Sequence, residues 1–372
     1  MVHNLYGDGV HDDTAAIQEM IDGSAEVALP MPKVHYLISK PLELHSNCRL
    51  VLPRFAEIRL AKGSNCVMLK NKTVTDRKER KKTFYHVNEY SPNSPCQNIE
   101  VVGGIWNGNN AEQEESGIAG HWVYGFLFYN VRNLRISSLT LKNTCTFGAT
   151  LDTVSYFTVD NIVFDHSKMH LNTDGIHCCG NCHFGQITNL KGACYDDLLA
   201  FNADEGSDGD ITNIDVRGIY AEDCHSAVRL LNVKNHVENI HISEVHGTYY
   251  TYCIGITKYY PGEYTGYYDA ITIDNVTASK AAMKDFFQYY AKEPYAVISI
   301  ENVKAKNIRI SDVYRKEYNR PFPSIQIREG AEIENLILDN ITYENHSGQE
   351  SMPMFLNQGI VKHLDLRNLR EG

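Results

Sequence analysis

An alternation of apolar and polar residues recurs along most of the chain as a short repeat. Each copy is an Asn, or a residue in its place, followed by the pattern apolar-x-apolar-x-x-apolar. The copies begin at Asn98, Asn133, Tyr156, His183, Asn213, Asn239, Ala270, Asn307, Asn335 and His363. Successive starts lie 23 to 37 residues apart. Alternation with a period of two predicts strands, and a loose repeat with little helical signal predicts stacked β coils.

These features favour an all-β fold, a right-handed parallel β-helix, over two other repeat folds. A leucine-rich repeat would show a tighter period with helical returns, and a propeller needs roughly 40–45 residues per blade. Apolar residues at helical spacing after Asp12 predict a short helix over residues 12–23, which would cap the open first coil. Residues 70–97 are rich in charge and then in Pro, Ser and Asn, and predict a loop insertion, either at the edge of a binding cleft or solvated without a role. We therefore expect one domain over residues 1–372.

The charge balance restricts the classes of partner. With 35 Lys and Arg against 46 Asp and Glu, the net charge is -11, which argues against nucleic acid or an anionic membrane but allows an anionic sugar. No apolar run approaches the roughly 18 residues of a membrane span, and no signal peptide begins the chain, so the cytoplasm is expected unless a leader was removed. Ten Cys are present, and those in strand-like runs (Cys145, Cys194, Cys253) are expected to be free and buried.

Three carboxylates stand about one repeat apart. Asp174 follows Asn172-Thr173, and Asp196 and Asp197 come 22 and 23 residues later. His225 comes 28 residues after Asp197, so stacked coils would place all four in one row. Close carboxylates repel, and one of them should keep its proton, which is the division of labour that glycoside hydrolysis needs. The alternative is that Asp-Gly and Asp-Asp only mark turns.

Three motifs resemble the pectin-degrading polygalacturonases of glycoside hydrolase family 28. They are NTDG at 172–175, DDLLAFN at 196–202 and CHSAVRLLN at 224–232, beside the family's NTDG, GDDCIAIN and GHGxxIGS. The opening GDGVHDDTAAIQ also resembles the start of many pectin-lyase-like β-helices. The resemblance implies an inverting hydrolase of a pectin-like or related uronic-acid-containing glycan, with no cofactor. It further implies that Asp196 is the general acid and that Asp174 and Asp197 activate water. His225 would then support the acid and the substrate, and Asn172 would orient Asp174 or a sugar hydroxyl.

Several positions depart from the family pattern. Tyr195 replaces the Gly before the acid pair, and GITK at 255–258 stands where the family has RIK, so the Arg that reads the uronate carboxylate is missing. Arg229 and Lys258 are candidate replacement cations, and an altered uronide or a neutral sugar becomes an option. Tyr195 and Tyr259 are candidate sugar contacts. The tyrosine-rich segment 249–269 around Lys258 would either stack on sugar, or pack internally or in a subunit contact of a homo-oligomer.

Two metal sites and two rival functions were weighed against this hypothesis. His177, Cys178, Cys179 and Cys182 could bind zinc, but their spacing is irregular and core packing is favoured. The acidic loop 204–210 offers oxygen ligands for calcium but lacks the EF-hand order, so a solvated turn is favoured. We therefore expect no metal. The rival functions are a non-catalytic, tailspike-like glycan-binding β-helix and a polysaccharide lyase or epimerase.

Overall fold

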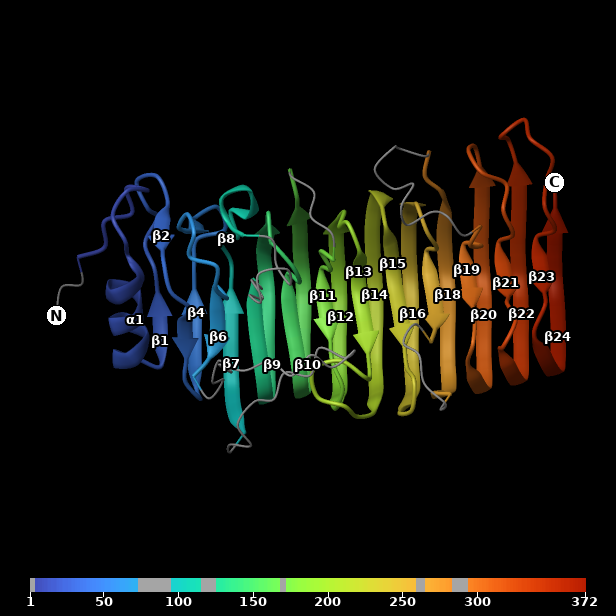
Figure 1. Cartoon of the computed structure of the whole chain (residues 1–372), viewed down its shortest axis with the longest axis horizontal. Coiled ribbons are helices and arrows are strands. Elements are labelled where there is room, and N and C mark those ends of the chain that lie inside the picture. The colour runs from blue at the N-terminus through green and yellow to red at the C-terminus, as the bar shows by residue number, and fades with distance from the viewer. Residues whose placement is uncertain (1–3, 73–94, 115–124, 168–171, 259–264, 283–293) are drawn as a thin grey trace.

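The chain forms a row of stacked β coils with a single helix at its N-terminal end (Figure 1). The structure is a computed structural model that describes residues 4–72, 95–114, 125–167, 172–258, 265–282 and 294–372. Most of the predicted insertion at 70–97 therefore lies outside the described residues. Its two described ends belong to strands rather than to a loop, because Lys70 and Asn71 lie in β6 and Cys96 and Gln97 in β7.

The N-terminal coils are built from short elements. These are α1 (Thr14–Gly23), β1 (Glu26–Ala28), β2 (Tyr36–Ile38), β3 (Leu42–Leu44), β4 (Cys48–Val51), β5 (Glu57–Leu60), β6 (Leu69–Asn71), β7 (Cys96–Val102), β8 (Ile105–Asn107) and the 3-10 turn η1 (Asn110–Glu112).

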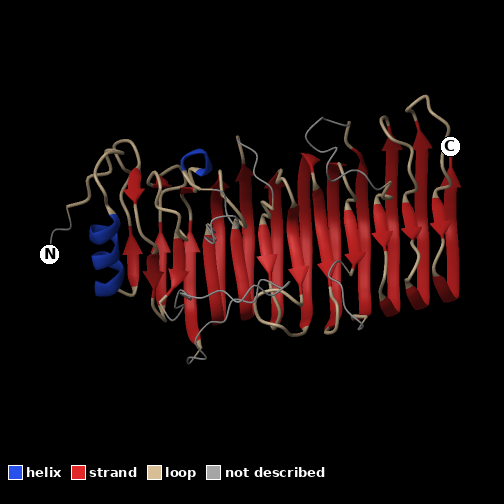
Figure 2. Cartoon of the chain, viewed as in Figure 1, coloured by secondary structure: helices blue, strands red, loops and turns tan. Residues whose placement is uncertain are grey.

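The coils of β9 and β10 each hold one strand of 17 residues, and the coils after them combine a short strand with a long one (Figure 2). The long strands are β9 (Phe126–Lys142), β10 (Ala149–Asp165), β12 (Cys182–Gly192), β14 (Ile211–Cys224), β16 (His236–Tyr249), β18 (Tyr267–Lys280), β20 (Lys304–Glu317), β22 (Glu332–Asn345) and β24 (Ile360–Glu371). The short strands are β11 (Ile176–Cys178), β13 (Asp197–Asn202), β15 (Ser226–Leu231), β17 (Ile254–Thr257), β19 (Ile298–Ile300), β21 (Ile325–Ile327) and β23 (Phe355–Asn357).

Every pairing between the described strands is parallel and joins one coil to the next. In the short-strand stack, Ala200 of β13 lies in register with His177 of β11 on one side and with Arg229 of β15 on the other. This topology confirms the predicted right-handed parallel β-helix. Among the described residues, no helix has the length and apolar character needed to cross a membrane.

The repeat seen in the sequence marks a corner of the coils. Asn213 and Asn239 both adopt positive φ (59° and 54°), a left-handed conformation that Asn tolerates better than other residues with a side chain. Asn239 Nδ2 donates a hydrogen bond to Asn213 Oδ1 of the preceding coil over 2.7 Å. The repeat that was predicted to begin at His183 has its corner one residue later, at Phe184. There Phe184 and Tyr156 stack at 5.1 Å in place of the asparagine contact.

The interior is a continuous apolar column, because the same inward positions recur in register on successive coils. Ile214, Ile240 and Ile271 are aligned in this way and are fully buried or nearly so. Cys145, Cys194 and Cys253 are buried and free, as predicted.

Helix α1 covers the first coil. It begins at Thr14, two residues later than predicted, because Asp12 instead forms an isolated bridge with Leu37 and binds the Thr14 backbone. Its buried Ile17 and Ile21 face the core, and the Gln18 amide hydrogen-bonds the Glu43 backbone in β3. The predicted capping role is thus confirmed.

Candidate active site

Backbone hydrogen bonds place Asp174 and the Asp196–Asp197 pair on adjacent coils. Gly175 N donates to Asp197 O over 3.0 Å, and Asp196 N donates to Thr173 O over 3.2 Å. A Cβ at Gly175 would lie 2.3 Å from the Leu198 carbonyl oxygen. The glycine after Asp174 is therefore needed for the two coils to approach this closely.

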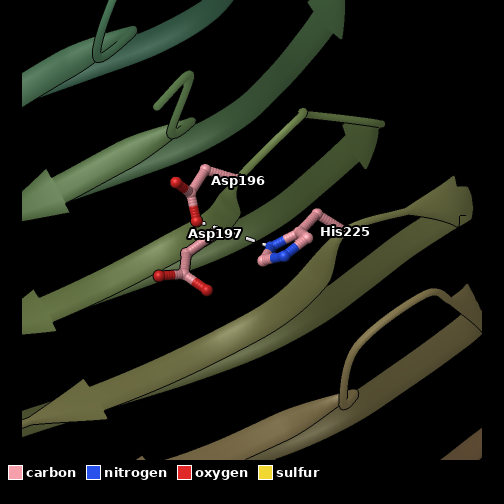
Figure 3. A group of neighbouring side chains, drawn as sticks. All are labelled: Asp196, Asp197 and His225. Atoms are coloured by element: carbon pink, nitrogen blue, oxygen red, sulfur yellow. Dashed lines mark ion pairs between the residues drawn. The ribbon is translucent and has the colours of Figure 1, made fainter. Parts of the chain in front are cut away.

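His225 extends this row onto the next coil. Its backbone N donates to Cys194 O over 3.3 Å, and its Nδ1 lies 3.4 Å from Asp196 Oδ1 (Figure 3). Burial lowers the pKa of His225 to about 4, so the imidazole beside Asp196 is neutral at pH 7. The row of acids and histidine that the coil spacing predicted is present.

The surroundings of Asp196 and Asp174 shift the pKa values of the two carboxyls to different extents. Burial, followed by the charges of Asp174 and Asp197, raises the pKa of Asp196 well above its ordinary value. Burial also raises the pKa of Asp174, to about 6, but the hydrogen bond and charge of His177 oppose that rise. The surroundings therefore favour a retained proton on Asp196 more strongly than on Asp174.

A cation and a hydroxyl hold Asp197. Ser226 Oγ donates to Asp197 Oδ1, and Arg229 Nη1 lies 3.5 Å from Asp197 Oδ2. Arg229 Nε also donates to Thr257 Oγ1 over 3.3 Å. Arg229, a candidate substrate-binding cation, thus lies beside Asp197, and Ser226 supplies an additional donor to it.

The other predicted contact residues lie around this row in different ways. Asn172 is half-buried with a φ of 60° and forms the turn that leads to Asp174. Lys258 is half-buried and directly follows Thr257, the partner of Arg229, so it lies on the coil of β17. Tyr195 packs against the cluster of Tyr250 and Ala281. Tyr259 lies outside the described residues.

The tyrosine-rich segment has a packing role in its described part. Tyr249, Tyr250, Tyr252 and Tyr268 are all at most 4% exposed. Tyr268 Oη donates to the backbone oxygens of Thr257 and Leu230, which ties neighbouring coils together. These four rings are therefore not available as sugar-stacking faces.

The predicted solvated turn at 204–210 is wrong for its first two acids. Asp204 and Glu205 are 4% and 5% exposed. Asp204 is buried because it accepts hydrogen bonds from Val233 N and Asn235 Nδ2 of the next coil. Burial raises its pKa to about 6. Asp208, further along the turn, pairs with Lys234.

Sequence reasoning missed the connection between Asp174, His177 and Glu205. His177 Nδ1 lies 2.5 Å from Asp174 Oδ2, and its Nε2 lies 2.9 Å from Glu205 Oε2. His177 and Glu205 are 28 residues apart, but the residue in register with His177 on the next coil is Ala200, so coil spacing alone does not indicate the pair. The zinc hypothesis instead grouped His177 with neighbouring cysteines. Cys178 and Cys182 belong to the hydrophobic core.

Within the described part of the chain, the atoms best placed to hold a metal ion belong to Asp196, Asp197 and His225. One ligand atom from each lies within 4.8 Å of the others. Two carboxyls and an imidazole are also a suitable set of groups for proton transfer, and burial, followed by the neighbouring carboxyls, raises the pKa of Asp196 well above its ordinary value.

Comparisons with known proteins agree with this fold. Solved structures that resemble the chain include the Streptococcus pneumoniae surface adhesin PfbA (16% identity, 99% of this chain and 91% of that chain, TM-score 0.55). A second is the A-module of the Azotobacter vinelandii mannuronan C-5 epimerase AlgE4 (12% identity, 99% of this chain and 95% of that chain, TM-score 0.58). A third is the tailspike of E. coli bacteriophage HK620 in complex with pentasaccharide (12% identity, 98% of this chain and 63% of that chain, TM-score 0.70). At these identities the likeness concerns the fold alone. No curated protein matches the chain in sequence.

The architecture is that of the pectin-lyase-like parallel β-helix proteins. A family model, glycosyl hydrolases family 28, matches residues 67–352. The chain belongs to this family.

Proposed function

We propose that this protein is an inverting glycoside hydrolase that cleaves glycosidic bonds in a pectin-like or related uronic-acid-containing oligo- or polysaccharide. The observation that carries the proposal is the pair of acids on adjacent coils with separated proton affinities. Burial and the neighbouring carboxyls raise the pKa of Asp196 well above its ordinary value, whereas the contact with His177 opposes the rise at Asp174, whose pKa is about 6. Hydrolysis with inversion needs this combination of one acid and one base.

In the proposed reaction the proton of Asp196 passes to the glycosidic oxygen as the bond to the anomeric carbon breaks. Water attacks that carbon from the opposite face and gives its proton to Asp174. Asp197, held by Ser226 and Arg229, helps to bind this water. The reaction ends with Asp196 ionised and Asp174 protonated, and exchange with solvent restores the starting state.

The substrate class rests on family membership and on the cations at the site. A uronate carboxylate needs a positive partner, and Arg229 lies among the acids with Thr257 and Lys258 on the adjoining coil. Arg229 is also engaged with Asp197, however, and the family's RIK arginine is absent. We therefore expect a substrate whose carboxylate reaches the site from the side of β15 and β17.

The test is a panel of uronic-acid-containing and neutral glycans, assayed for new reducing ends and for the anomeric form of the product by NMR. Hydrolysis with inverted configuration supports the proposal. An unsaturated uronide product would make the protein a lyase, an altered sugar in an intact chain would make it an epimerase, and binding without turnover would make it a glycan-binding protein.

The Asp196→Asn variant tests the assignment of the acid. Loss of a general acid costs typically about 10²- to 10⁴-fold in rate, while glycan binding should persist. Asp165→Asn is the matched control, because Asp165 is an exposed acid that pairs with Lys142 at the protein surface. Full activity in Asp196→Asn would show that another group supplies the proton.

A further inference from the structure

His177 lies in a line of three buried charged groups that spans two coils. Asp174, in the turn before β11, contacts Nδ1 at 2.5 Å, and Glu205, in the turn after β13, contacts Nε2 at 2.9 Å. The side chains of all three are at most 7% exposed. His177 Nδ1 is hydrogen-bonded to Asp174, and Nε2 lies at ion-pair distance from Glu205, so carboxyl groups on both sides of the ring favour its positively charged form.

The remaining neighbours of the ring favour the same protonation state. Phe147 stacks on the imidazole with a centroid distance of 3.9 Å and an interplanar angle of 4°. The aligned residues on β10 and β13 are Thr150 and Ala200, which carry no charge. Among charged groups, Asp152 of β10 adds another carboxyl nearby, and the Cys179 thiol also interacts with the ring.

The proton affinity of His177 follows from these contacts. Burial lowers its pKa, but the bonds to Asp174, Cys179 and Glu205 more than offset this, so the pKa lies well above its ordinary value. The effect on Asp174 is reciprocal, because the hydrogen bond and charge of His177 lower the Asp174 pKa against burial and the charges of Asp197 and Glu205.

A count of charges shows why the site needs this cation. The carboxyl groups of Asp174, Asp196, Asp197 and Glu205 gather here, and Arg229 is a cation beside Asp197. His225 is neutral. His177 supplies a second positive charge, and it lies against Asp174, whereas Arg229 lies against Asp197. Without His177, Asp174 would lose both a donor and its nearest compensating charge, and it would take up a proton.

We propose that His177 is a positioning residue that keeps Asp174 ionised and oriented toward the attacking water, and that Glu205 holds the imidazolium in place from its other side. This role rests on the proposed function, because it acts through Asp174 as the base. The three family motifs do not include either residue, and the contact between them arises from the stacking of coils.

The kinetic test compares pH profiles of kcat/KM for the full chain and two variants. His177→Gln should lower kcat, leave KM nearly unchanged and move the acid limb to higher pH by about 1–3 units, the usual effect of losing an adjacent opposite charge. Glu205→Gln should move the limb in the same direction by less, because the imidazolium loses one of its two carboxylates. This milder variant keeps the test available if His177→Gln does not fold.

His241→Gln is the matched control. His241 also lies between two carboxylates, Asp215 at 2.8 Å and Asp274 at 2.6 Å, but its side chain is 45% exposed and it lies on β16, outside the site. Its loss should leave the acid limb in place. An unchanged acid limb in both His177→Gln and Glu205→Gln would overturn the proposal, as would an equal shift in His241→Gln.

A second measurement needs no substrate. In the 15N-histidine NMR spectrum, the signal that His177→Gln removes should be that of a doubly protonated ring at pH 7.5, and Glu205→Gln should move its titration to lower pH. A neutral ring at pH 7.5 would overturn the proposal. If the wild-type chain hydrolyses no glycan, the proposed function fails, and this titration alone then decides whether the charged line exists.

Discussion

The buried carboxyl of Asp152 allows a prediction about stability. Asp152 lies on β10 and is fully buried, and its oxygens accept hydrogen bonds from Ser207 N at 3.0 Å and Thr153 Oγ1 at 3.1 Å. Burial is the main cause that raises its pKa, from 3.8 to about 7. Since the folded protein holds this proton more tightly than the unfolded chain, Asp152→Asn should be more stable than wild type at pH 8 and equally stable near pH 4.

The sign and size of the stability difference follow from the linkage between proton binding and folding. Between pH 4 and 7 the unfolded chain has lost the proton while the folded protein retains it, so the contribution of Asp152 to stability falls as the pH rises and levels off above 7. Each pKa unit corresponds to about 1.4 kcal/mol, which gives a total loss on the order of 4 kcal/mol. With an unfolding entropy of about 2 cal/mol/K per residue, this corresponds to a Tm difference of about 5 °C for a chain of this length.

Thermal unfolding of both proteins from pH 4 to pH 8 measures this difference directly. Other buried acids, such as Asp174 and Asp204, also change the stability with pH, but they do so equally in both proteins. The difference in Tm between variant and wild type therefore isolates Asp152. Asp165→Asn, at an exposed acid, is the control and should give a difference that does not vary with pH. A constant difference for Asp152→Asn as well would refute the reasoning.

Three further substitutions test the packing and charge of the structure. Gly175→Ala places a Cβ 2.3 Å from the Leu198 carbonyl oxygen, so it should cost about 1–3 kcal/mol in thermal unfolding and lower kcat by displacing the acids; an unchanged Tm would contradict the close approach. Glu317→Gln removes the charge that pairs with fully buried Arg315, so urea unfolding should show a loss of about 3–5 kcal/mol, and a loss under 1 kcal/mol would contradict the pairing. Arg229→Gln should lower kcat/KM more for uronic-acid-containing substrates than for neutral ones, and equal losses would show that Arg229 acts only on the acids.

Much of the fold could be predicted because the strands and the corners of the coils each produce a recognisable sequence pattern. Strands with one buried face alternate apolar and polar residues, and several corners, such as those at Asn213 and Asn239, adopt the left-handed backbone that Asn tolerates. At the coil of β12 the corner residue is Phe184, and the predicted start was displaced by one residue, to His183. The start of α1 was also displaced, because the bridge between Asp12 and Leu37 is a tertiary contact that no local pattern reveals.

The acid row could be predicted because residues one coil apart in sequence become neighbours in space. His177 and Glu205 do not follow this rule, because Ala200 is in register with His177 and Glu205 lies in the turn beyond it. Each also has a local pattern that suggested something else: cysteines around His177 and a turn-like acidic run around Glu205. Burial of that acidic turn depends on donors from the next coil, such as Val233 N, and sequence spacing does not show which backbone groups point toward it.

The position of the cations explains which acid retains the proton. Three buried carboxyls on adjacent coils cannot all ionise, and the proton should settle on the one with the weakest compensation. Asp197 has Arg229 at 3.5 Å, Asp174 has His177 at 2.5 Å, and Asp196 has the neutral ring of His225 at 3.4 Å. In the mechanism that we propose, Asp196 is the general acid because Arg229 and His177 lie against the other two acids, and a change that gave His225 a lasting charge would lower the pKa of Asp196 and weaken it as an acid.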